Sequence, residues 1–230
     1  GCTGLTSVTI PNSVTNIGKY AFYDCTSLTS ATIGNSVTSI GEDAFSSCTG
    51  LTEILYNAKA AADLALGSDV FRNAGSSSGG LRVIIGDGVK KIPSCLFYGC
   101  TGLTSVTIPD TISSIGSTAF RDCTGLSSVT IPDSVTSIGG SAFYGCAGLT
   151  CVTIGNGVTS IGGYAFSRCT GLTEIIYNAK AAADLGNGPD AFYSAGISSG
   201  GFRVVIGDGV EKIPGYLFSD CTGLTSVTIG

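Results

Sequence analysis

A hydrophobic pattern that recurs every 23 residues limits this chain more than any other feature of its sequence. The segment Leu5-Thr-Ser-Val-Thr-Ile10 returns nearly unchanged at Leu28–Ile33, Leu103–Ile108, Leu126–Ile131, Leu149–Ile154 and Leu224–Ile229. Altered copies lie between them at Leu51–Tyr56, Leu81–Ile85, Leu172–Tyr177 and Phe202–Ile206. A fixed period of this length predicts stacked repeats, because one repeat alone cannot bury its apolar side chains.

A longer period of 121 residues lies on top of the short one, since Cys2 recurs as Cys123 and Cys100 as Cys221. We therefore expect residues 1–230 to form a single domain made of two tandem copies of a 121-residue block, the second incomplete. Each block contains an insertion, which in the first block is Asn57–Leu64. The alanines of this insertion favour a short helix, while Ser76–Gly80 and Ser198–Gly201 are typical of exposed loops.

Within one repeat, the alternation through Val8-Thr9-Ile10 predicts a short strand. Pro or Gly followed by Asn or Asp ends that strand with turn-forming residues. Strands of successive repeats then run parallel, about 4.8 Å apart, in a body on the order of 45 Å long. The side chains expected to point inward in the first repeat are Leu5, Val8, Ile10, Val14, Ile17, Ala21, Phe22 and Cys25.

The spacing Leu-x-x-Val-x-Ile-Pro-x-x-Val-x-x-Ile-Gly-x-x-Ala-Phe-x-x-Cys, seen at residues 126–146, resembles the BspA-like, Treponema pallidum-type leucine-rich repeat family. The resemblance covers essentially the whole chain. It implies a repeat solenoid with a right-handed superhelix, one parallel β-sheet of about ten short strands, and short helical or 3-10 turns on the opposite side. Known members are mostly bacterial cell-surface or secreted proteins implicated in adhesion, so the resemblance also implies an extracellular or cell-surface location.

Charge and hydropathy exclude several classes of partner. The net charge of -5 and the lack of clustered Lys and Arg predict no nucleic-acid partner. No apolar run approaches the roughly 18 residues that span a bilayer, so we expect no direct membrane insertion. Because the chain begins and ends inside a repeat, we expect a piece of a longer protein whose signal and anchor lie outside it.

Ten cysteines raise the question of disulfides. In-register neighbours in a parallel ladder lie about 4.8 Å apart, beyond the reach of a relaxed disulfide, which predicts free, buried thiols over a disulfide framework. Cys95 and Cys151 fall out of register and are expected to be more exposed, as surface thiols or as intermolecular cross-link sites. The other eight, here named the ladder cysteines, share one repeat position: Cys2, Cys25, Cys48, Cys100, Cys123, Cys146, Cys169 and Cys221.

If Val8 and Ile10 point inward, then Ser7 and Thr9 point outward, and the same alternation covers the whole strand face with hydroxyls. A solvated β-surface, O-linked glycosylation or sugar contact, and ice binding all remain open for this face. No Asn-x-Ser/Thr sequence occurs, which excludes N-glycosylation. The other outward pairs are Ser30 and Thr32, Ser105 and Thr107, Ser128 and Thr130, and Ser226 and Thr228.

The hydroxyl pattern is interrupted once in each block, by an acid, an arginine and two branched apolar side chains. An ordinary surface ion pair worth about 0.2 to 1 kcal/mol is one explanation. A pair of equivalent partner-binding patches is the other, because exposed arginine and aliphatic clusters mark interfaces. The candidate partner-binding residues are Glu53, Leu55, Arg82 and Ile84 in the first patch, and Glu174, Ile176, Arg203 and Val205 in the second.

The sequence offers no catalytic, cofactor-binding or metal-binding set, since it has no His and its carboxylates occupy turn positions such as Asp110 and Asp133. We therefore expect a protein that is not an enzyme. The leading hypothesis is an adhesion module for a protein or glycan ligand. The alternative is a structural subunit that stacks head to tail into an extracellular filament through its terminal repeats.

Overall fold

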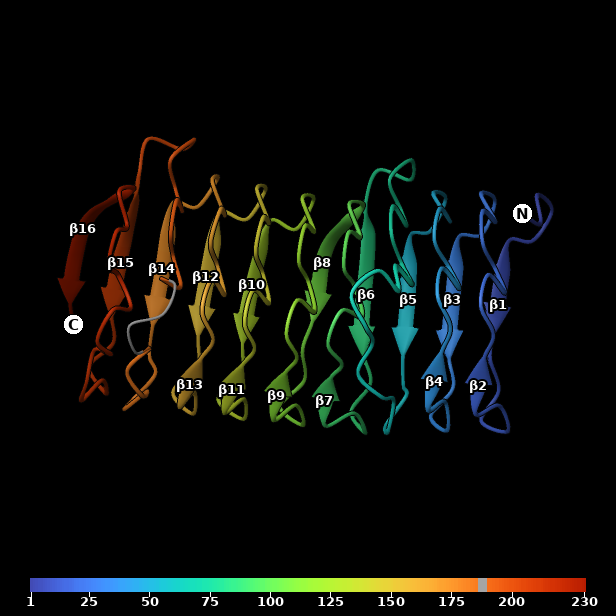
Figure 1. The fold of residues 1–230 in the computed structure, drawn as a ribbon, viewed down its shortest axis with the longest axis horizontal. Helices are drawn as coiled ribbons and strands as arrows, with labels where there is room; N and C mark the ends of the chain where they lie inside the picture. The colour runs from blue at the N-terminus through green and yellow to red at the C-terminus, as the bar shows by residue number, and fades with distance from the viewer. Residues whose placement is uncertain (186–189) are drawn as a thin grey trace.

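The computed structural model describes residues 1–185 and 190–230 as a row of parallel strands, one long strand per repeat, with the termini at opposite ends (Figure 1). Alternate residues of each strand point inward, as the Val8-Thr9-Ile10 pattern predicts. The long strands are β1 (Ser7–Thr9), β3 (Ser30–Ile33), β5 (Glu53–Tyr56), β6 (Leu81–Ile85), β8 (Leu103–Thr107), β10 (Ser128–Ile131), β12 (Cys151–Ile154), β14 (Glu174–Tyr177), β15 (Phe202–Ile206) and β16 (Leu224–Ile229).

The long strands pair in parallel and in the register set by the repeat, with Val129 opposite Val152, for example. They form two five-stranded sheets, β1-β3-β5-β6-β8 and β10-β12-β14-β15-β16, rather than the single sheet expected from the sequence. The break between β8 and β10 falls at the junction of the two 121-residue blocks. We call this break the seam.

A second face carries two-residue strands where only turns were expected: β2 (Asn16–Ile17), β4 (Ser39–Ile40), β7 (Lys91–Ile92), β9 (Ser114–Ile115), β11 (Ser137–Ile138) and β13 (Ser160–Ile161). The strand β9 pairs with β11, so this narrow sheet continues across the seam and keeps the two blocks joined.

The core between the two faces is one continuous stack of apolar side chains. A column of phenylalanines runs along it, with ring centres 5.1 Å apart between Phe120 and Phe143. Phe120 belongs to the repeat of β8 and Phe143 to that of β10, so the column crosses the seam without interruption. Stacking of this kind adds to the hydrophobic gain from burying each ring. The members of the column are Phe22, Phe45, Phe71, Phe97, Phe120, Phe143, Phe166, Phe192 and Phe218.

The segments that lead into the phenylalanines are chains of β-turns, and the described residues contain no helix, which corrects the expectation of helical or 3-10 turns. Only alternate amides bond within the repeat: Cys25 donates to the Phe22 carbonyl at 3.3 Å, whereas Phe22 donates to Ala44 of the next repeat at 2.8 Å. Tyr20 and Asp24 have φ values of 57° and 54°. A 3-10 helix needs successive internal bonds and negative φ, so the bonds between repeats exclude it here.

The predicted helix at Asn57–Leu64 is also absent, and the reason is again hydrogen bonding between repeats. Its amides donate to neighbouring repeats, as Lys59 does to the Asn35 carbonyl (3.2 Å) and Ala62 to Thr38 (3.0 Å). The carboxylate of Asp63 accepts from the Ser94 amide at 2.7 Å. The predicted exposed loops at Ser76–Gly80 and Ser198–Gly201 are confirmed, and they project beyond the neighbouring repeats (Figure 1).

All ten cysteines are free thiols, as predicted. Six of the ladder cysteines are buried, while Cys2 is exposed and Cys221 half-buried because the terminal repeats lack an outer neighbour. The Cys123 thiol donates to the Phe97 carbonyl of the preceding repeat at 3.1 Å. The expectation that Cys95 is more exposed is wrong: it is buried, with its Sγ 2.8 Å from Thr118 Oγ1. Cys151 is half-buried, more exposed than the inner ladder cysteines, as predicted.

Candidate binding surfaces

The strand face carries the hydroxyl surface that the alternation predicts. Ser7 and Thr9 on β1 and Ser128 and Thr130 on β10 are exposed, while their inward neighbour Val129 is buried. The outward residues of β3 are half-buried because strands cover them on both sides. The remaining outward pairs, Ser105 with Thr107 and Ser226 with Thr228, are exposed as well.

The structure brings together the four residues of the first patch. Glu53 lies opposite Arg82, and Leu55 lies opposite Ile84, on the adjacent strands β5 and β6. Arg82 Nη2 lies 2.7 Å from Glu53 Oε2, and both side chains are about half exposed. An ion pair this open contributes little to stability. Its effect is to hold the guanidinium in one orientation beside two aliphatic side chains.

The second patch has the same arrangement on β14 and β15. Glu174 lies opposite Arg203, and Ile176 lies opposite Val205. Arg203 Nη2 lies 2.7 Å from Glu174 Oε1. The two patches differ in the residue that faces the acid from the preceding strand: Cys151 on β12 lies opposite Glu174, whereas Ser30 on β3 lies opposite Glu53. Burial, together with the negative charge of Glu174, raises the pKa of the Cys151 thiol.

A row of arginine and tyrosine on the edge next to the β-turns escaped the sequence analysis. Tyr98, Arg121 and Tyr144 occupy one position in three successive repeats, directly after the stacked phenylalanines. The Arg121 guanidinium carbon lies 5.9 Å from the Tyr98 ring centre and 4.4 Å from that of Tyr144. Arg168 approaches Tyr144 at 5.7 Å. The 23-residue spacing of these three residues was the signal that could have revealed the row.

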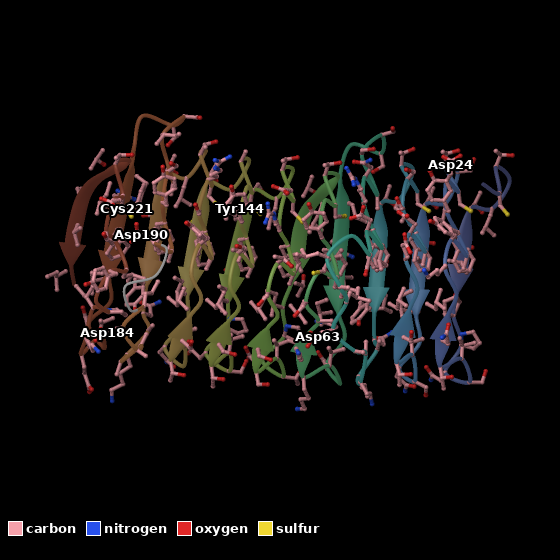
Figure 2. All side chains as sticks on the ribbon, in the orientation of Figure 1. Asp24, Asp63, Tyr144, Asp184, Asp190 and Cys221 are labelled. Atoms are coloured by element: carbon pink, nitrogen blue, oxygen red, sulfur yellow. The ribbon has the colours of Figure 1, made fainter. Side chains whose placement is uncertain are left out.

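Figure 2 shows Tyr144 near one end of the strands and Asp63 and Asp184 near the other. The two aspartates are equivalent residues of the two blocks. Lys91 lowers the pKa of Asp63, and the Gly215 amide, which donates to Asp184 Oδ1 at 2.6 Å, lowers the pKa of Asp184. These carboxylates fix the insertions to later repeats, so we assign them a structural role.

Within the described part of the chain, no group of three or more His, Cys, Asp or Glu side chains is placed to hold a metal ion. The same residues include no helix with the length and apolar character required to cross a membrane.

Known proteins with solved structures resemble the chain over almost its whole length. A leucine-rich repeat protein from Bacteroides ovatus is 26% identical, with 98% of this chain and 67% of that one covered and a TM-score of 0.50. A leucine-rich cell surface protein from Faecalibacterium prausnitzii is 24% identical, with 98% and 79% covered and a TM-score of 0.45. The T. pallidum leucine-rich repeat protein is 20% identical, with 97% and 69% covered and a TM-score of 0.47.

No curated protein matches the chain. A family model described as the BspA type leucine-rich repeat region matches residues 1–79 and 187–230, in six copies that together cover more than half of the sequence. The unmatched residues between these ranges form strands of the same solenoid, from β6 to β14. The chain therefore belongs to the BspA-type leucine-rich repeat family.

Proposed function

We propose that the chain is an extracellular or cell-surface binding module, rather than an enzyme, and that its strand face holds a protein or glycan ligand for adhesion. The observation that carries this proposal is the recurrence of one patch, with the same four kinds of side chain, 121 residues apart. Neither the core nor the strand register requires these side chains on the solvent face, because the other repeats carry Ser or Thr there, or Cys151 in β12.

The chemistry of each patch suits recognition of a partner. Arginine is enriched among the residues that dominate binding energy, and its fixed planar group forms directed hydrogen bonds. In both patches the arginine is already paired with the acid in the free protein, so the arginine side chain loses less conformational entropy when a ligand binds. Two similar patches on one chain also allow a single ligand to bind at two places.

Substitution of the two arginines tests the proposal. Arg82→Gln and Arg203→Gln, singly and together, are compared with the unmodified protein for binding to arrays of purified extracellular matrix proteins and of glycans. We expect each single change to weaken binding by about tenfold and the double change to remove it. Arg72→Gln is the matched control, because Arg72 pairs with Asp69 at 2.9 Å in a turn, away from the strand face. Unchanged binding by the double variant contradicts the proposal.

Head-to-tail stacking into a filament is a second candidate function, in which β16, with Val227 48% and Ile229 72% exposed, would pair with β1 of another copy. Inside the chain, the seam places β8 next to β10, and these two strands have nearly the same sequences as β16 and β1. The strands β8 and β10 do not pair, which argues against stacking of β16 on β1 and favours the binding module. Sedimentation over a range of concentrations, with electron microscopy, separates the two. If the chain stays monomeric at high concentration, the filament hypothesis is ruled out.

A further inference from the structure

The seam is an opening in the strand face, bounded by hydrogen bonds at both ends. At one end the Ser127 amide lies 3.4 Å from the Thr104 carbonyl, and at the other the Thr136 amide donates to Ser113 at 2.8 Å. Between these bonds the described residues show no pairing of β8 with β10. Figure 1 shows β8 and β10 set apart in the row of long strands.

Comparison with a paired junction shows which backbone groups the seam leaves free. Between β1 and β3 the Ile10 amide donates to the Thr32 carbonyl at 2.8 Å. The equivalent residues at the seam are Ile108 and Thr130, and among the described residues no hydrogen bond joins them. Both strands therefore present an open edge to solvent inside an otherwise paired row, and open edges accept further strands.

A β-bulge coincides with the place where β8 leaves β10. Leu81 pairs with Leu103 and the next residue, Arg82, pairs with Ser105, so Thr104 is an extra residue in β8. Its hydroxyl donates to the Leu81 carbonyl at 3.2 Å. A bulge bends its strand and increases the local twist, which turns the remainder of β8 away from the following block.

A cleft of about 660 Å³ lies over the opening, lined by apolar side chains such as Val106, Ile108 and Ile131, and extends past β10 to Gly155 and Asn178. Val106 lies in register with the fully buried Val83 and yet is only half-buried, because the strand that would cover it is displaced. Hydroxyls of Ser105, Thr107, Ser128 and Thr130 line the walls, and the carboxylates of Asp110 and Asp133 lie at the carboxyl end of the two strands.

We propose that the seam cleft binds an extended peptide of a partner protein, which adds as a strand against β8 and β10. Main-chain hydrogen bonds to the two open edges supply affinity that is independent of side chains, as in other cases of strand addition. The apolar floor accepts alternate branched side chains, and the two aspartates favour a basic residue at the end of the peptide. This site does not depend on the patches of the strand face.

A defined probe tests the proposal: the fluorescently labelled peptide acetyl-Lys-Thr-Val-Thr-Val-Thr-Lys-amide, whose binding is measured by anisotropy. We expect saturable binding to the 230-residue chain. A second peptide, N-methylated at both valines, keeps the side chains and loses two amide donors, so it should bind about tenfold more weakly or worse. A third peptide with Glu in place of Lys should also bind more weakly.

The protein offers a matched pair of proline variants. Thr130→Pro removes an amide at the open seam and leaves the β10–β12 ladder intact, so it should fold normally and bind the probe about tenfold more weakly. Thr153→Pro, at the same repeat position in β12, removes an amide from a paired junction and should lower the melting temperature. The double change Arg82→Gln with Arg203→Gln should leave probe binding unchanged, which separates this proposal from the proposed adhesion function.

Hydrogen exchange supplies a readout that does not depend on any variant. The amides that face the seam, those of Ile108 and Thr130 among them, should exchange rapidly in the free protein and slow down when the probe is bound. Protection of both amides without the probe would show a closed seam and overturn the proposal. Equal binding of the N-methylated and unmodified peptides, or no binding of the unmodified probe, would also overturn it.

Discussion

The guanidinium carbon of Arg121 lies 4.4 Å from the centre of the Tyr144 ring, and the two residues hold the same position in successive repeats. Directly beneath them, Phe120 and Phe143 stack with ring centres 5.1 Å apart. The buried phenylalanine column therefore fixes the spacing of the side chains on the surface. Residues 23 apart in the sequence become neighbours, just as cross-strand pairs do in a sheet.

This contact predicts a measurable coupling between the two residues. A double-mutant cycle of Arg121→Gln and Tyr144→Leu should give about 0.5 to 1 kcal/mol of interaction free energy in urea unfolding, typical of an exposed cation–π pair. Tyr23→Leu is the control, because Tyr23 holds the equivalent position in the first repeat, whereas Arg121 belongs to the fifth. Its effect should add to that of Arg121→Gln. Simple additivity of Arg121→Gln and Tyr144→Leu contradicts the prediction.

Successive repeats pack closely at the turn before each long strand. This packing predicts that Gly148 is required and that Gly4, at the same repeat position, is not. A Cβ on Gly148 would lie 2.4 Å from the Thr124 carbonyl oxygen, whereas a Cβ on Gly4, at the same repeat position, meets no atom within 4 Å. Gly148→Ala should therefore cost about 1 to 3 kcal/mol, and Gly4→Ala should cost almost nothing. Thermal melting of the two variants checks this, and equal melting temperatures would count against it.

The sequence was sufficient to predict the strand register, because one inward set recurs with a fixed period. It did not reveal the seam, since β8 has the same sequence as Leu5–Ile10, whose strand is paired. What distinguishes β8 is the bulge at Thr104, which follows from the 22-residue step between Leu81 and Leu103. The length of the repeat, rather than the residue types in β8, was therefore the sequence feature that indicated the seam.

Two predictions were wrong for the same reason: the helix in the insertion and the exposure of Cys95. Alanine propensity favours a helix at Asn57–Leu64 by a few tenths of a kcal/mol per residue, and hydrogen bonds to Asn35 and Thr38 outweigh it. Cys95 was expected at the surface because tyrosines hold its position in other repeats. The thiol is shorter than a tyrosine and packs against Thr118 instead of reaching solvent. In both cases the neighbouring repeat decides the outcome.

The hydroxyl of Tyr56 predicts a stabilising substitution. The side chain is fully buried, and its oxygen has no hydrogen-bond partner among the described residues. Burial raises the pKa of this phenol, in keeping with an apolar environment. Tyr56→Phe removes the unsatisfied group and keeps the ring, so it should raise the free energy of unfolding by about 1 kcal/mol. Tyr56→Leu is the control for lost packing and should lower it; a loss of stability in Tyr56→Phe would disprove the prediction.

Burial of the ladder cysteines predicts a loss of stability in alkaline solution. Desolvation raises the pKa of Cys48 and of Cys100 to about 12, from an ordinary value of 9.0. Above about pH 9 the unfolded chain releases these protons and the folded chain keeps them, which favours unfolding. The stability that the neutral thiols contribute is complete below pH 9 and is lost as the pH rises toward 12, at about 1.4 kcal/mol per pH unit for each thiol.

Alanine at the same position isolates this effect, because Ala74 and Ala195 already occupy the equivalent slot in two repeats. Cys48→Ala combined with Cys100→Ala should fold, lose some packing at pH 7, and show a shallower decline between pH 9 and pH 11 than the unmodified chain. Urea midpoints at each pH measure the decline. Other titrating groups, such as Tyr177 with its pKa raised to about 12, affect both proteins equally. Parallel pH profiles for the two proteins would mean that the buried thiols do not cause the alkaline loss.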